Sequence, residues 1–299
     1  MIEIKTHKIL VPIDFSETSI WAIKHAAAIL KNSKGELILL NVFKRSDLIN
    51  IILPAFNLKN SSVIKDYLDY KMEKLSKKIR KEYEITVMPI VALGNITDEI
   101  VSIAEKNNVG LIIMGTHGSD STNSLFLGSN SYRVLIKSQI PVMTVRTDAP
   151  KEGYADILLP IDSSAHSRQK VNSAIKIADS FGARLHVLGL LGKHELDYEY
   201  KLKVILPQIV KLAREKHLVC TSEIDKTSNR AGETLAYAEK SYSDLIIIMT
   251  DQKSEFSGLI LGTYAHQLIN NSKIPVLCIP PEMHPENMEQ AVIGGMWQR

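Results

Sequence analysis

Residues 8–14 read KILVPID, and the pattern returns as DILLPID at residues 156–162, 148 positions further on. Each stretch is followed by a serine-rich turn and then by an alanine-rich segment with helical spacing, residues 21–30 and 171–178. Self-similarity at so long a period indicates a duplicated structural unit. Each copy is therefore predicted to begin with a strand, a turn and a helix.

A second pair of matches lies later in each copy, at an offset of 134 residues. LIIM at 111–114 matches LIII at 245–248, and LGS at 127–129 matches LGT at 261–263. The second copy is therefore 14 residues shorter, and the difference falls between residue 43 and about residue 65. A chain of 299 residues suits two domains. We predict domains at 1–148 and 154–281, followed by a C-terminal tail at 282–299.

Apolar runs alternate with helical stretches through the first copy, at residues 9–13, 37–42, 85–92, 111–114 and 141–145. Uninterrupted apolar runs are typical of parallel strands buried on both faces. The pattern predicts an α/β fold in which each domain has a Rossmann-like, doubly wound, five-stranded and mainly parallel sheet flanked by helices. Ligands of such sheets bind beyond the carboxyl ends of the strands, where the strand order reverses.

The composition excludes several classes of protein. There are 36 basic and 33 acidic residues, a balance that argues against a dedicated nucleic-acid surface. No apolar run approaches the ~18 residues of a membrane span, and the N-terminus lacks a signal-peptide pattern, so we expect a cytoplasmic protein. Cys220 and Cys278 have no partner spacing typical of zinc sites or disulfide frameworks, and we expect both to be buried.

A candidate phosphate site follows the run at 111–114. Gly115 and Gly118 permit positive φ and close backbone approach, so that amide groups can point at phosphate oxygens. Gly128 opens a predicted helix, whose N-terminus favours an anion, and Ser129 and Ser131 add hydroxyl donors. The spacing matches neither a P-loop nor a dinucleotide fingerprint. An ordinary tight turn is the alternative for the first two glycines.

The spacing Gly115-x2-Gly118-x9-Gly128-Ser129 resembles the ATP-binding signature of the universal stress protein (UspA) family, and VPID at 11–14 resembles that family's first strand. The resemblance covers nearly the whole chain, twice, and tandem copies are familiar in the family. It implies an adenine nucleotide alpha hydrolase-like fold and an ATP ligand, with any Mg²⁺ held through the phosphates. The residues implied to bind ATP are Pro12, Asp14, Val42, Gly115, His117, Gly118, Gly128, Ser129, Asn130 and Ser131.

The second copy departs from this signature. Met249 and Gln252 replace the two glycines after the strand, so a Cβ crowds each position. Asp251 adds negative charge beside the expected phosphates. We therefore expect ATP in the first copy and no high-affinity triphosphate binding in the second. The rest of the pattern persists there as Asp162, Gly262 and Thr263.

Several functional alternatives stay open at this stage. The resemblance implies a nucleotide-dependent stress-response regulator or protective factor, with no catalytic residue assigned. A slow ATP hydrolase or adenylyl-transferring enzyme could use the same residues, and a nucleotide-free scaffold could bind a lipid or protein through the apolar segment 48–56. That segment could equally be a lid or core cover. We interpret Ser16, Ser19, Ser163 and Ser164 as helix caps rather than nucleophiles.

Two further surfaces bear on partners. The lysine-rich stretch 65–81 is interleaved with acidic residues, which is typical of a solvated helix face. The closing strands 142–145 and 276–279 would be sheet edges in isolated domains, and unpaired edges recruit partners. The resemblance implies that the two domains pair as an internal pseudo-dimer, with a homodimer of the chain as a further expectation.

Overall fold

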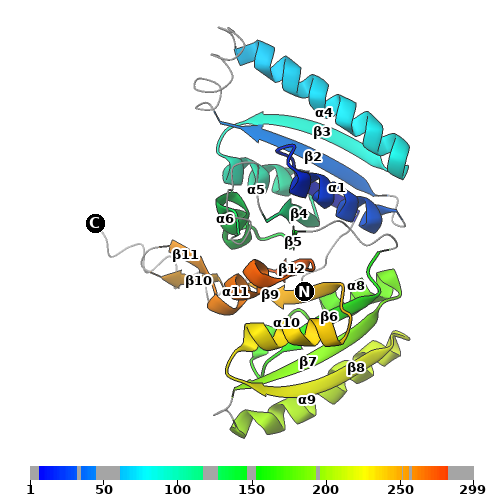
Figure 1. Ribbon diagram of the computed structural model, residues 1–299, viewed down its shortest axis with the longest axis vertical. Helices are drawn as coiled ribbons and strands as arrows, with labels where there is room; N and C mark the ends of the chain where they lie inside the picture. The colour runs from blue at the N-terminus through cyan, green and yellow to red at the C-terminus, as the bar shows by residue number, and fades with distance from the viewer. Residues whose placement is uncertain are drawn as a thin grey trace.

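The computed structural model describes residues 7–31, 35–44, 61–116, 127–146, 153–192, 196–250, 252–255 and 258–281. The predicted α/β class is confirmed, because both halves place parallel strands between helices (Figure 1). The first half contains β1 (Lys8–Pro12), α1 (Glu17–Leu30), β2 (Glu36–Phe43), α4 (Ser61–Tyr83), β3 (Thr86–Leu93), α5 (Ile96–Lys106), β4 (Leu111–Gly115), α6 (Ser129–Lys137) and β5 (Val142–Val145). The second half contains β6 (Asp156–Ile161), α7 (Ala165–Arg168), α8 (Val171–Phe181), β7 (Arg184–Gly192), α9 (Leu196–Glu215), β8 (Cys220–Thr227), α10 (Arg230–Lys240), β9 (Leu245–Met249), β10 (Gln252–Glu255), β11 (Gly258–Leu261), α11 (Thr263–Asn271) and β12 (Val276–Ile279).

The strands form one ten-stranded sheet in the order β3-β2-β1-β4-β5-β12-β9-β6-β7-β8. Within each half the neighbouring strands of this sheet run parallel, and the order reverses between β1 and β4 and again between β6 and β9. The strands β10 and β11 form a separate antiparallel pair. The closing strands β5 and β12 pair antiparallel at the centre, with Val142 opposite Cys278. The two strands predicted to be recruiting edges therefore pair with each other. Figure 1 shows one half on each side of this strand pair.

Two hydrophobic cores cover the two faces of the sheet. Successive residues of β1 alternate between them, so Ile9 and Val11 face one core and Leu10 faces the other, all fully buried. Burial of one such side chain contributes roughly 1.5–3 kcal/mol. The first core is completed by α1, α4, α8 and α9, and the second by α5, α6, α10 and α11. Each core contains residues of both halves, so the hydrophobic core continues across the β5–β12 junction.

The second half differs from the first in two elements that the repeat does not predict. Gln252 begins the β10–β11 hairpin, so this position of the second half lies in a strand. The continuous helix α1 is replaced by the short α7 and by α8, with Lys170 between them.

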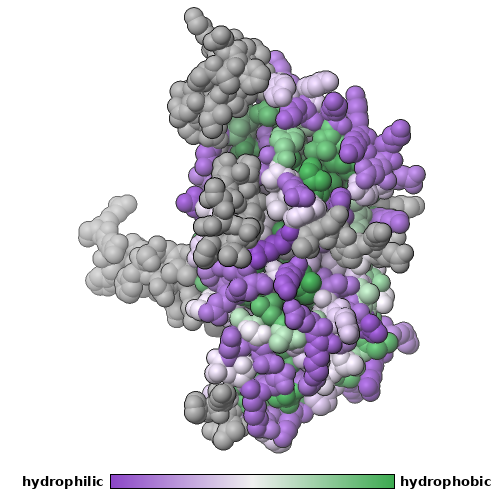
Figure 2. Space-filling model, in the orientation of Figure 1, coloured by the Kyte–Doolittle hydropathy of each residue, from purple (hydrophilic) through white to green (hydrophobic). Residues whose placement is uncertain are grey.

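On the face shown in Figure 2, hydrophilic side chains dominate both halves. The solvated face of α4 carries exposed ion pairs such as that of Lys65 with Asp69, at 2.8 Å. Both cysteines are buried, as expected. Segment 48–56 and the tail 282–299 lie outside the described residues.

Candidate functional site

The described candidate residues of the first half gather at one edge of the sheet. Pro12 ends β1 with Asp14 two residues beyond, Val42 lies near the end of β2, Gly115 ends β4, and Gly128 caps α6. Because β1 and β4 are neighbours on either side of the order reversal, this edge is the topological switch point of the domain. These residues therefore lie at the edge of the sheet where ligands of doubly wound folds bind. His117 and Gly118 lie outside the described residues.

Asp14 is fixed by the start of α1. Its Oδ1 accepts hydrogen bonds from the backbone N–H of Ser16 at 2.9 Å and from the Ser16 hydroxyl at 2.5 Å. Ser16 in turn caps α1 by accepting from the N–H of Ser19 at 3.3 Å. This turn holds an exposed carboxylate at the edge of the sheet. Capping is confirmed for Ser16 and for Ser164, which caps α7, but was wrong for Ser19 and Ser163.

Gly115 is required for a different reason from the one expected. Its φ is not positive, since the positive-φ glycines among the described residues are Gly153 and Gly182. A Cβ at this position would instead lie 2.6 Å from Oγ1 and 2.7 Å from Cβ of Thr18. The close approach of α1 to the end of β4 therefore excludes a side chain. Gly128 also has an ordinary backbone, with φ −58° and ψ 144°.

The N-terminus of α6 has no side-chain cap. The N–H of Gly128 donates to the backbone oxygen of Thr116 at 2.5 Å, and that of Leu127 donates to Asn270 Oδ1 at 2.6 Å. The first N–H groups of a helix have no acceptor within it and carry the positive end of its dipole. Such an end binds phosphate oxygens well. The helix amides in position to do so belong to Ser129, Asn130 and Ser131.

Two buried polar side chains hold this edge together. The Ser131 hydroxyl donates to the backbone oxygen of Gly115 at 2.8 Å, which joins α6 to β4 and gives this side chain a positioning role. Asn41 Nδ2 donates to the backbone oxygen of Ile13 at 2.6 Å, which joins β2 to the end of β1. Asn41 was not predicted, although an amide inside an otherwise apolar strand was the available signal.

Arg146, also missed, connects this edge to the second half. Its Nε donates to the Thr116 hydroxyl at 3.3 Å and its Nη1 to the backbone oxygen of Asn270 at 2.5 Å. Burial lowers the pKa of Arg146, but a guanidinium stays protonated. A cation therefore lies beside the residue that follows Gly115, held by a helix of the other half.

The equivalent edge of the second half preserves the aspartate turn and loses the glycine. Asp162 Oδ1 accepts from the N–H and hydroxyl of Ser164 at 2.9 and 2.6 Å, as Asp14 does with Ser16. Met249 is buried at the end of β9, where the first half has Gly115. A cavity of about 100 Å³ lies at this edge.

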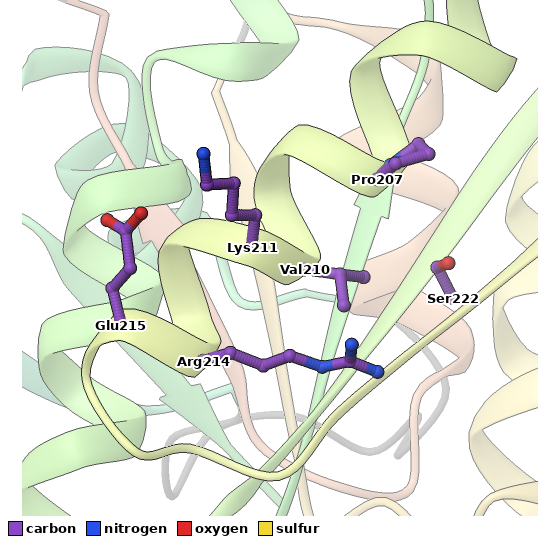
Figure 3. A pocket seen from close by; sticks show the side chains of 6 residues that line it. All are labelled: Pro207, Val210, Lys211, Arg214, Glu215 and Ser222. Atoms are coloured by element: carbon purple, nitrogen blue, oxygen red, sulfur yellow. The ribbon is translucent and has the colours of Figure 1, made fainter.

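A larger hollow of about 510 Å³ lies elsewhere, between α9 and β8. In Figure 3, Val210 and Arg214 extend from α9 toward β8, which carries Ser222, while Lys211 and Glu215 lie on the other side of the helix. The hollow is lined by the end of α9 and the start of β8. It therefore lies away from the carboxyl edge where the candidate residues gather.

Comparisons with known proteins agree with this architecture. The universal stress protein family model matches residues 5–146 and again residues 153–280. Universal stress protein MJ0577 of Methanocaldococcus jannaschii is 36% identical over 152 residues, covering 46% of this chain and 94% of that protein. Universal stress protein YxiE of Bacillus subtilis is 30% identical over 148 residues, covering 47% of this chain and 99% of that protein. A universal stress protein structure from Archaeoglobus fulgidus covers 92% of this chain and 99% of its own, with a TM-score of 0.75 at 20% identity, which supports the fold. Within the described residues, no helix is long and apolar enough to cross a membrane.

Proposed function

Because the chain belongs to the universal stress protein family, we propose that its first domain binds ATP at the switch point between β1 and β4 and serves as a nucleotide-dependent stress-response regulator. The observation that carries the proposal is the N-terminus of α6, which no side chain caps and which lies at the same edge as Asp14. In this arrangement Asp14 and Val42 contact the nucleoside and α6 receives the phosphates.

The chemistry of this edge suits a triphosphate. Backbone amides at a helix N-terminus supply oriented donors and partial positive charge without a side chain to desolvate. Gly115 leaves the end of β4 without a side chain, and Arg146 adds a fixed cation nearby. In our proposal Mg²⁺ is held by the phosphates alone, and no group of three metal-binding side chains occurs in the described part of the chain.

The second domain is proposed to pair with the first rather than to bind a second ATP. Met249 fills the position that Gly115 leaves open. We propose binding as the primary activity, with hydrolysis as the alternative that the experiment must also measure.

The test compares two aspartates that make the same turn. Mass spectrometry of the natively purified protein should find a bound adenine nucleotide. In calorimetric titrations, Asp14→Asn should weaken ATP binding about tenfold, the factor that a loss of ~1.4 kcal/mol produces. Asp162→Asn should leave the affinity unchanged, because it alters the equivalent turn in the other domain.

The results of these experiments distinguish ATP binding from ATP hydrolysis. Equal losses in both variants, or no nucleotide binding by the wild type, would refute ATP binding in the first domain. Product analysis after incubation with labelled ATP distinguishes a binder from an enzyme. Turnover far above background would replace the binding role by a hydrolase.

A further inference from the structure

The cavity of about 100 Å³ in the second domain has a wall unlike that of the equivalent edge in the first domain. It lies at the carboxyl ends of β6, β7 and β9, beside the starts of α10 and α11. Its volume is far below the several hundred Å³ of common small-molecule sites. The lining residues are Pro160, Ile161, Asp162, His166, Ser167, Lys170, Leu190, Arg230, Met249 and Tyr264.

The repeat shows which of these residues are new to the second domain. At the offsets of 148 and 134 residues, Lys170 stands where the first domain has Ala22, and Arg230 stands where it has Ile96. His166 and Tyr264 replace Thr18 and Asn130 in the same comparison. Two apolar positions have thus become cationic around one cavity.

Lys170 is built into the wall rather than extended into solvent. The residue is 3% exposed, and its ammonium donates to the backbone oxygen and the hydroxyl of Ser167 at 3.1 and 3.2 Å. It lies at the break between α7 and α8, where the first domain has a continuous helix. Burial of an ammonium is costly unless compensating groups surround it. A cation fixed in a cavity wall favours an anionic occupant.

The other polar groups of the cavity wall also favour an anionic occupant. Arg230 Nη1 lies 3.8 Å from Asp162 Oδ2, a loose ion pair, so the lining residues that the structure describes include two cations, Lys170 and Arg230, and one carboxylate. Desolvation raises the pKa of Tyr264, so this phenol keeps its proton. Its oxygen lies 3.0 Å from Thr234 Oγ1, and the hydroxyl can act as donor or acceptor.

We propose that this cavity binds a small oxyanion, a phosphate or carboxylate group, held by Lys170 and Arg230. Met249 is one of the lining residues, and the volume is too small for a nucleoside triphosphate. The second domain would then sense a small anion while the first domain binds its own ligand. The inference rests on this cavity alone and does not depend on ATP binding in the first domain.

The test follows methionine signals in the full-length protein. Protein labelled with ¹³C at the methionine methyl groups is titrated with inorganic phosphate, and separately with acetate, at constant ionic strength maintained with sodium chloride. Met249 lines the cavity, and Met114 lies directly before Gly115, the counterpart of Met249 at the end of β4, so the two signals report the two domains. Met249→Leu assigns the first signal and Met114→Leu the second.

We expect a saturable shift of the Met249 signal within about 10 mM of at least one anion, which corresponds to millimolar or tighter affinity. Lys170→Gln and Arg230→Gln should each weaken binding at least tenfold. Lys176→Gln removes an equal charge from the exposed face of α8, the helix that Lys170 directly precedes, and should bind as the wild type does.

Each result of the titrations either supports or overturns the anion site in the second domain. The arm that saturates, phosphate or acetate, identifies the chemical source of the oxyanion. A shift confined to Met114 would place the anion in the first domain and overturn this proposal while leaving ATP binding intact. Equal affinity in Lys170→Gln, Arg230→Gln and the wild type would also overturn it, as would the absence of a shift with both anions.

Discussion

At the scale of single residues, the contact between Gly115 and Thr18 decides how tightly α1 can approach β4. A Cβ on Gly115 would lie 2.6–2.7 Å from side-chain atoms of Thr18, so Gly115→Ala forces the helix or the strand to move. We expect Gly115→Ala to lower the free energy of unfolding by ~1–3 kcal/mol, the usual cost of overpacking. Chemical denaturation of the full-length protein measures this change.

The control is the double variant with Thr18→Gly. By itself, Thr18→Gly should cost about 1 kcal/mol as a glycine in a helix. Because it removes the two atoms that clash, the double variant should be more stable than the sum of the single changes predicts. Strict additivity would show that Thr18 is not the obstacle. The sequence motif identified Gly115 but not this reason, because Thr18 is 97 residues away in the chain and only the fold brings it close.

At the scale of elements, the repeat predicted that a helix follows the first strand of each domain, but not that this helix is interrupted in the second domain. Apolar runs and helical spacing located β1, β6, α1 and α8, because these signals are local, whereas α7 lies in the segment expected to be a serine-rich turn. The break at Lys170 and the β10–β11 hairpin follow from packing in the second domain, for which the repeat offers no counterpart. The edge that holds the candidate site was predictable because its residues lie at the ends of strands and at the start of a helix, which the sequence pattern locates.

The N-terminus of α6 provides a test of the phosphate position. Ser129→Glu places a carboxylate in the first turn, where the helix dipole stabilises it by roughly 0.3–1 kcal/mol. The same charge should repel the phosphates of ATP and weaken binding at least tenfold, because like charges a few Å apart cost ~1 kcal/mol or more even in water. Calorimetric titration and thermal melting measure the two effects.

The matched variant is Thr263→Glu, at the same position of α11 in the second domain. It should leave ATP affinity unchanged and should raise stability by a similar ~0.3–1 kcal/mol, because its carboxylate lies in the first turn of α11. Loss of binding in Thr263→Glu, or unchanged binding in Ser129→Glu, would contradict phosphate binding at α6.

At the scale of the whole molecule, the two domains share a sheet, both cores and the support of the candidate site. The strand pattern predicted that the closing strands recruit partners, and the family resemblance implied that the two domains pair; in the structure β5 and β12 pair with each other. The sequence could not predict that Asn270 of α11 contacts the first domain, since the hydrogen bond to Leu127 spans 143 residues. Residues that support a site from another domain carry no local signal.

This contact predicts that the second domain tightens the ATP site of the first. Asn270→Ala removes the acceptor of the Leu127 N–H, directly before Gly128. We expect this amide to exchange faster with deuterium and ATP affinity to fall several-fold, since one hydrogen bond contributes about 1 kcal/mol. Asn271→Ala is the control, because its side chain bonds only within α11 among the described contacts, to the backbone oxygen of Gln267 at 2.7 Å. Faster Leu127 exchange with unchanged ATP affinity would show that α11 supports the fold of the first domain without tuning its site.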